Sequence, residues 1–434
     1  MGNKLSKIWN SPSVRNVGKL LSANVVAQAI GILVYPILTR LYSPEDFGLL
    51  NLFMSIGGIL VLLSTSEYQN AIVLPKEDWR ARALVQLCAG LLLMMVLLLI
   101  CSVPFSGQIA TLFKAPELRR WWWLMPFYVG GLSAWVVLSN YYIRTKSFQR
   151  ISVYQISQSL TNAGGKLCFG FAGFLSGGMI ISTILAPIIG IGISLLKGGG
   201  RLFEGLRKVD KEVLRTEASC YRNFPLYSLP RSLVSTLCPN LPILMLAPVF
   251  GMTELGFFGM ALTLAMRPLQ MVVQSEYQVL LQRTAQMVND KQKIGGLLLK
   301  NIGMAFAVLI PFFAGLYIIL PWLAGMLLGP SWRISGEYIR LLLPWLLMMT
   351  AVAPIGFVTD IFSQQRVALI IEVIYLILSI AALTIGITTR DFRLTILFYS
   401  LVNAGVISGQ MFWYLWLIKR YDRSVEELEA DGWH

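Results

Sequence analysis

The sequence is poor in the residues that most enzymes use for chemistry. Its only histidine is the last residue, His434. Its five cysteines form no CxxC pair, and most lie in apolar runs, where a free thiol behaves as a small hydrophobic side chain. These absences exclude a histidine-based catalytic or proton-relay site and indicate neither a disulfide framework nor a zinc site. We therefore expect no catalytic residue, no metal and no cofactor.

Charge is scarce as well. Charged residues make up 13% of the 434 residues, about half the share of a soluble chain, whereas hydrophobic residues make up 56%. Apolar runs of about 20 residues, long enough to cross a hydrocarbon layer about 30 Å thick, recur along the whole chain. The sequence therefore predicts an all-α polytopic membrane protein and excludes a soluble domain.

The apolar runs predict twelve spans and an inside-facing N-terminus. Their approximate bounds are 20–39, 47–72, 83–105, 121–142, 151–175, 179–196, 224–249, 255–279, 297–321, 338–359, 367–387 and 395–417. Lys and Arg, 36 against 22 Asp and Glu, gather in the alternate loops that an inside N-terminus makes cytoplasmic. The positive-inside rule, by which Lys and Arg concentrate in cytoplasmic loops, accounts for the net charge of +14 without a nucleic-acid partner. We expect both termini in the cytoplasm.

The chain divides into two halves of six spans each. Residues 1–196 form the first lobe, and residues 223–434 form the second lobe with a short cytoplasmic tail. Between them, residues 197–222 carry apolar side chains at roughly helical spacing among basic ones, which predicts a cytoplasmic amphipathic linker at the membrane surface.

The two halves repeat. The sequence SEYQ of residues 66–69 recurs at residues 275–278. Three further short matches are collinear with it: residues 45–48 with 253–256, 112–116 with 327–330, and 147–150 with 363–366. Because six spans separate the copies, both halves have the same orientation, which is typical of transporters with a path between two lobes.

Three cations fall inside predicted spans. Lys166, Arg231 and Arg267 would each cost about 2.5–3.5 kcal/mol in the bilayer if nothing compensated them. Their repeat-related positions hold Ala382, Ala23 and Ile59, so neither half reproduces the other's cations. A charge needed for the fold would be expected twice, and we therefore favour a substrate cavity. For Arg231, an ion pair with Glu372 at similar depth is an equal alternative.

A polar stripe leads to one of these cations. Gln155, Gln158, Asn162 and Lys166 are spaced 3, 4 and 4 residues apart, which places them on one face of a helix. Such a stripe has to face protein or water. We predict a cavity wall, with a packed polar interface as the alternative.

Two carboxylates occur at repeat-related positions. Glu67 and Glu276 lie near the cytoplasmic ends of spans two and eight. They are candidates either for helix-end ion pairs with loop cations such as Arg80 or Arg283, or for gate and ion-coupling groups. We count Glu372 among the coupling candidates.

Short motifs resemble a known family. LTRL at residues 38–41, SPEDFG at 43–48, FPLYS at 224–228 and LLGP at 327–330 resemble Wzx-type polysaccharide flippases. That family belongs to the superfamily of multidrug and toxin extruders and lipid II flippases. The resemblance implies twelve helices in two six-helix lobes forming a V, and alternating access. It also implies transfer of undecaprenyl-pyrophosphate-linked oligosaccharide repeat units to the outer leaflet of a bacterial inner membrane.

The residues agree with this expectation. Lys166, Arg231 and Arg267 suit phosphates or acidic sugars, and Gln155, Gln158 and Asn162 suit sugar hydroxyls. The glycan would serve surface polysaccharide, such as the O antigen of lipopolysaccharide or an exopolysaccharide.

The partners expected are membrane lipids, the polyprenyl-pyrophosphate oligosaccharide, a coupling H+ or Na+, and the polysaccharide polymerase machinery. No P-loop is present, because Leu167 replaces the Ser or Thr that would follow Lys166. An ion gradient is therefore the expected driving force. The alternatives are a multidrug extruder of the same superfamily, and a membrane polysaccharide polymerase or ligase.

Overall fold

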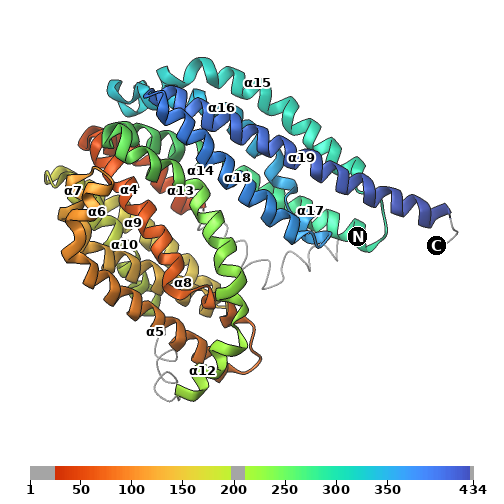
Figure 1. Ribbon diagram of the computed structural model, residues 1–434, viewed down its shortest axis with the longest axis horizontal. Coiled ribbons are helices and arrows are strands. Elements are labelled where there is room, and N and C mark those ends of the chain that lie inside the picture. Colours follow the sequence, from red (N-terminus) through yellow and green to blue (C-terminus); the bar gives the residue numbers. More distant parts are fainter. Residues whose placement is uncertain (1–24, 197–210, 431–434) are drawn as a thin grey trace. The chain divides into compact units, whose positions relative to one another are not determined.

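The computed structural model describes residues 25–196 and 211–430, and within them it contains helices and no strands. The chain forms two compact units, residues 1–256 and 257–434 (Figure 1). These units do not test the predicted lobes, which end at residue 196 and begin at residue 223, so the lobe limits stay a prediction. Of the predicted linker, residues 197–210 lie outside the described residues, and the remainder contains helix α12 (Lys211–Cys220).

The first unit is built from helices joined by short turns, several of which lie side by side as the red-to-yellow ribbons of Figure 1. Its first described helix is apolar and covers Val25–Leu41. Its elements are α3 (Tyr35–Leu41), α4 (Pro44–Thr65), η1 (Tyr68–Val73), α5 (Asp78–Ser102), η2 (Val103–Phe105), α6 (Ser106–Leu112), α7 (Pro116–Trp121), η3 (Trp122–Leu124), α8 (Met125–Arg144), α9 (Phe148–Phe171), α10 (Leu175–Leu196), α12, η5 (Phe224–Ser228) and α13 (Leu229–Phe250).

In the second unit, α15 packs against α16 and α18 packs against α19, which are neighbours in sequence, and α16 packs against the more distant α19. Its elements are α14 (Met252–Asn289), which starts in the first unit, α15 (Gly295–Leu328), η6 (Pro330–Trp332), α16 (Arg333–Val352), η7 (Ala353–Ile355), α17 (Val358–Ile361), α18 (Gln365–Thr388) and α19 (Phe392–Ala430). Asp422 of α19 accepts hydrogen bonds from the backbone N–H groups of Ile294 and Gly295, at 2.8 and 2.9 Å. It thereby caps the start of α15, whose first amides have no partner within the helix.

The predicted all-α membrane fold is confirmed. Within residues 25–196 and 211–430, each predicted span coincides with helical structure, and ten helices are long and apolar enough to cross a membrane. Two elements are not among the ten. The helix over Val25–Leu41 is shorter, and α9 has 24 residues but is too polar. The count of twelve spans therefore stays a prediction. Helix α9 is less apolar than the ten candidates because it carries the predicted polar stripe.

Helix α4 begins with a capping box. Ser43 Oγ accepts the backbone N–H of Asp46 at 3.2 Å, and the Asp46 carboxylate accepts the backbone N–H of Ser43 at 2.9 Å. Pro44 occupies the first turn, where its missing N–H costs nothing. The SPEDFG motif thus fixes where α4 starts.

Repeat-related residues meet where α4 crosses the start of α14. A Cβ added to Gly48 would overlap the carbonyl oxygen of Met252, and one added to Gly256 would overlap that of Pro44. Gly48 and Gly256 are 208 positions apart, as are Pro44 and Met252. The contact is therefore reciprocal, as contacts beside a two-fold axis are. Glycine is required at both positions because the two backbones touch.

Turns that end helices also repeat. Backbone φ is positive at Lys114 and Gly329, and again at Lys146 and Ser363. The first pair is 215 positions apart and the second is 217. The structure thus supports the internal repeat, and it shifts the pairing of residues 147–150 with 363–366 by one residue.

Prolines within helices are tolerated where other groups take over the freed carbonyls. Helix α13 continues as an α-helix through Pro239, Pro242 and Pro248. In α15, Pro321 has no N–H to donate to the carbonyl of Tyr317. The Arg340 guanidinium of α16 donates to that carbonyl and, at 2.8 Å, to the carbonyl of Ile318. The cation thus satisfies a backbone group that the bilayer could not.

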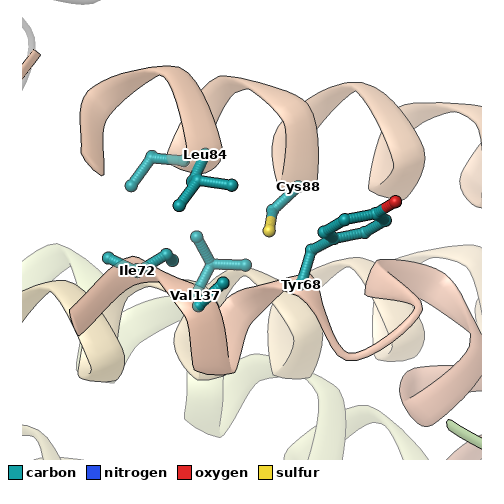
Figure 2. Close-up of a cluster of buried hydrophobic side chains, with 7 residues drawn as sticks. Tyr68, Ile72, Leu84, Cys88 and Val137 are labelled. Carbon is teal, nitrogen blue, oxygen red and sulfur yellow. The ribbon is translucent and has the colours of Figure 1, made fainter. Parts of the chain in front are cut away.

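A buried apolar cluster joins η1, α5 and α8. Figure 2 shows Leu84 and Cys88 of α5 pointing toward Ile72 and Tyr68 of η1 and toward Val137 of α8. Ala218 and Tyr221, at the end of the predicted linker, and Phe224, just after it, pack against the same cluster. The end of the linker is therefore anchored to the first unit.

The glycine crossing yields a stability prediction. Gly48→Ala and Gly256→Ala each place a methyl group against a backbone carbonyl, so each should cost about 1–3 kcal/mol, as overpacking does. Gly58→Ala is the matched control, because Gly58 lies on the same helix with no atom within 4 Å of the added Cβ. Thermal unfolding of the purified variants in detergent measures the difference. Equal melting temperatures for all three variants would contradict the close backbone contact.

Candidate functional site

Helix α9 carries the predicted polar stripe. All four members, Gln155, Gln158, Asn162 and Lys166, are half-buried on this helix. The stripe is the reason that α9 is less apolar than its neighbours, since without these four residues the segment would consist mainly of small and apolar side chains. The predicted helical face is therefore present, and its role in substrate binding stays a prediction.

Neighbouring helices hold α9 from two sides. On one side, a Cβ on Gly190 of α10 would contact Tyr154 and Gln158. On the other, Ser159 Oγ donates to the carbonyl of Ala27 at 2.7 Å, and Tyr42 Oη donates to the carbonyl of Lys166 at 2.7 Å. These contacts fix the rotation of α9 about its axis, and hence the direction of the stripe.

Two acceptors of the stripe are buried without a hydrogen bond. Gln155 Oε1 and Asn162 Oδ1 are inaccessible and accept no hydrogen bond from the described residues. A buried acceptor left unsatisfied costs about 1–3 kcal/mol. Donors brought by water or by a ligand hydroxyl would remove this cost.

The three deep cations lie on separate helices. Lys166 of α9 and Arg231 of α13 belong to the first unit, whereas Arg267 of α14 belongs to the second. Lys166 and Arg267 are half-buried and have interactions with other groups, and Arg231 is exposed. Glu372, the suggested partner of Arg231, lies half-buried on α18 of the second unit and also has an interaction.

The two SEYQ copies adopt different backbones. In the first copy, α4 ends at Thr65, and both Ser66 and Glu67 have positive φ, 48° and 66°. In the second copy, α14 continues without interruption through Glu276, which is half-buried. The repeated carboxylates are thus not in equivalent surroundings.

Glu67 is buried and does not pair with Arg80. Its side chain is 5% exposed and accepts a hydrogen bond from the Asn70 amide. Arg80 instead donates to the carboxylate of Glu217, with a shortest distance of 2.7 Å. Of the two alternatives for Glu67, the ion pair with Arg80 is therefore not formed, because the Glu217 carboxylate at the end of the linker binds this arginine. The gate or coupling alternative for Glu67 stays a prediction.

Sequence reasoning missed the docking of α12. Glu217, only 2% exposed, pairs with Arg80 of α5, and Tyr68 Oη donates to the carbonyl of Ala218 at 3.0 Å. Glu217 follows Arg80 by 137 positions and belongs to no motif, so the sequence offered no signal for the pair.

A known family covers most of the chain. Residues 37–336 match the family described as "Polysaccharide biosynthesis protein". The chain belongs to this family. The match runs from α3 into α16 and thus includes α9, α13 and α14. The predicted resemblance to polysaccharide flippases is confirmed at the level of the family.

A curated relative supports this assignment. The chain is 25% identical over 346 residues to the succinoglycan biosynthesis transport protein ExoT of Rhizobium meliloti (strain 1021). The alignment covers 76% of this chain and 65% of that protein, so the chain spans less than two thirds of its relative's length.

Solved structures show which fold this is. The inward-facing form of a multidrug resistance MATE transporter of the MOP superfamily superposes with a TM-score of 0.66 at 15% identity, covering 93% of this chain and 96% of that one. The lipid II flippase MurJ, in an inward closed conformation, gives 0.71 at 13% identity, covering 96% and 93%. The chain therefore has the fold of MOP-superfamily transporters and is a multi-pass membrane protein.

The Arg80–Glu217 pair yields a stability prediction. Arg80→Ala leaves the Glu217 carboxylate buried without its cation, so we expect a loss of about 1–3 kcal/mol. Glu77→Gln is the matched control, since Glu77 is half exposed and lies 3.9 Å from the same arginine. Thermal unfolding in detergent measures both variants. A shift for Glu77→Gln as large as that for Arg80→Ala would show that the buried pair does not stabilise α12.

Proposed function

We propose that this protein is a flippase for lipid-linked oligosaccharides in polysaccharide biosynthesis. In this proposal, undecaprenyl-pyrophosphate-linked repeat units move from the inner to the outer leaflet of a bacterial cytoplasmic membrane by alternating access. The observation that carries it is α9, a helix with a polar stripe and a lysine, within a chain that has a transporter fold and belongs to the polysaccharide biosynthesis family.

The chemistry of such a substrate fits the candidate residues. A pyrophosphate needs cations, and guanidinium groups bind phosphate with paired, charge-assisted hydrogen bonds. Arg231, Arg267 and Lys166 would provide these contacts. Gln155, Gln158 and Asn162 would bind sugar hydroxyls, which would supply the donors that two of their oxygens lack.

We place the membrane orientation and the lobes within the same proposal. Both termini would lie in the cytoplasm, and the lobes 1–196 and 223–434 would be joined by the linker 197–222. Delivery to a polysaccharide polymerase on the outer side would complete the path. The fold alone also suits a multidrug extruder, because a MATE transporter is among its structural neighbours. A cationic drug would prefer carboxylates to the cations found here.

A deletion in the native host tests this function. Loss of the gene should cause polyprenyl-pyrophosphate oligosaccharide to accumulate on the cytoplasmic side and surface polysaccharide to disappear. Complementing the deletion strain with the Arg267→Ala or Lys166→Ala variant should recover at most about a tenth of the wild-type flux. Loss of one charge-assisted hydrogen bond to the substrate weakens binding at least about tenfold.

Lys300→Ala is the control for loss of a cation, because Lys300 is exposed at the start of α15. It should restore full flux at equal expression. Normal glycan export in the deletion strain, together with changed drug susceptibility, would overturn the flippase in favour of the extruder. Full export by the Arg267 and Lys166 variants would reject the site but not the function.

We further propose that an ion gradient drives transport, with Glu67, Glu276 or Glu372 binding H+ or Na+. Moving two negative charges out of an inside-negative cell gains about 4–5 kcal/mol per 100 mV. In proteoliposomes, imposed potential and proton gradients should accelerate flipping. At least one of Glu67→Gln, Glu276→Gln and Glu372→Gln should remove the response to the proton gradient, while Glu77→Gln retains it. Sodium replaces the proton gradient in a second arm. Flipping that is independent of both gradients and of the potential would contradict the coupling.

A further inference from the structure

The FPLYS segment before α13 forms a wide helical turn. Residues 224–228 make up η5, a π-helix, and the backbone N–H of Leu229 donates to the carbonyl of Phe224, five positions earlier. Pro230 explains the widening, because it has no N–H for the carbonyl of Leu226 and its ring crowds that oxygen. Turns of this kind are rare and are frequent at functional sites. The shape of this turn is thus built into the sequence.

An exposed polar face runs from this turn along α13. Its members stand four residues apart, which places them along one side of the helix, and each is exposed: Asn223, Tyr227, Arg231 and Ser235. Tyr227 is 73% exposed. Among the described residues of the first unit, neither its hydroxyl nor the Arg231 guanidinium forms a hydrogen bond or ion pair. These four residues, the α13 face, include one cation and no carboxylate, so the face is complementary to an anion.

The depth of Arg231 requires a polar partner for it. It lies seven residues after Phe224, the first residue of a candidate membrane span, or roughly 10 Å along the helix at 1.5 Å per residue. Hydrocarbon does not stabilise a guanidinium at that depth, so the side chain has to reach water, a headgroup or a ligand. The α13 face therefore needs a polar occupant.

The internal repeat shows that a six-span half does not need this ring and this guanidinium. At the repeat offset of 208 positions, the counterparts of Tyr227 and Arg231 are Lys19 and Ala23. Both counterparts lie outside the described residues, so the comparison is one of sequence alone. Because neither side chain recurs, a role in ligand binding explains them better than a role in the fold.

The spacing of the two side chains matches a sugar joined to a phosphate. Residues four apart on a helix have Cβ atoms about 5–6 Å apart. In a glycosyl pyrophosphate the first sugar is bonded directly to the phosphate, so a ring and an anion lie side by side. A phospholipid headgroup would use Arg231 alone and leave the exposed ring of Tyr227 without a role.

We propose that Tyr227 stacks on the sugar next to the pyrophosphate of a lipid-linked glycan and that Arg231 binds the pyrophosphate. This inference rests on the proposed flippase function. The C–H groups on one face of a sugar ring are weakly positive and pack on the negative face of an aromatic ring. The guanidinium offers paired N–H donors to phosphate oxygens. Tyr227 thus distinguishes the glycosylated lipid from the bare carrier lipid, whereas Arg231 recognises both.

Three substitutions separate these two roles. Tyr227→Leu removes the ring and keeps an apolar side chain, whereas Tyr227→Phe removes only the hydroxyl. Arg231→Gln removes the charge and keeps groups that form hydrogen bonds. All three replace exposed side chains, so the melting temperature in detergent should stay at the wild-type value.

Two further substitutions are matched controls. Phe412→Leu removes an aromatic ring that is 66% exposed on α19, away from the α13 face. Arg215→Gln removes an exposed cation on α12. Both should leave every affinity within twofold of wild type.

The experiment measures the affinity of the purified protein for three probes. These are undecaprenyl pyrophosphate, the same lipid carrying one hexose, and phosphatidylglycerol. Wild type should bind the hexose-bearing lipid about three- to tenfold more tightly than the sugar-free lipid, as expected for one aromatic contact. Tyr227→Leu should abolish this preference and leave the affinity for the sugar-free lipid within twofold, whereas Tyr227→Phe should retain it. Arg231→Gln should weaken binding of both pyrophosphate lipids about tenfold.

The outcomes separate this inference from the flippase function. An unchanged sugar preference in Tyr227→Leu overturns the stacking role and leaves the flippase proposal intact, because glycan export tests that proposal independently. If Arg231→Gln weakens only phosphatidylglycerol binding, the arginine contacts phospholipid headgroups and its assignment to pyrophosphate is overturned. If wild type binds neither pyrophosphate lipid more tightly than phosphatidylglycerol, this inference and the proposed function are overturned together.

Discussion

A polar group inside the hydrocarbon layer has to find its partner within the protein, because the lipid offers none. In the second unit, Arg340 donates to backbone carbonyls beside Pro321, so this cation stabilises a helix that proline would otherwise weaken. In the first unit, Tyr42 and Ser159 hold the backbone and side chains of α9 in place. Gln155 Oε1 and Asn162 Oδ1 depart from this pattern. Buried acceptors that the described protein leaves unsatisfied are therefore better evidence for a ligand path than the presence of polar residues alone.

The internal repeat provides a comparison that a single sequence otherwise lacks. Features that recur, such as the glycines at the α4–α14 crossing and the left-handed turns, belong to the scaffold. Features found in one copy of the repeat, such as Lys166, are not needed to build that copy. Arg340 shows the limit of this reasoning, since a cation without a copy can still be structural when it satisfies a carbonyl freed by proline. The contacts of each residue that lacks a counterpart in the other half therefore have to be inspected before the residue is assigned to function.

Apolar runs and caps made most of the helices predictable, because length and hydrophobicity decide membrane insertion and the SPEDFG cap decides where α4 begins. The different backbones of the two SEYQ copies could not be predicted. The first is followed by Asn70, whose side chain binds Glu67, and by Pro75, whereas the second continues into strong helix formers. The Arg80–Glu217 ion pair could not be predicted either, because the two residues are 137 positions apart and only folding brings them together. Short identical motifs thus predicted the repeat but not the local chemistry of its members.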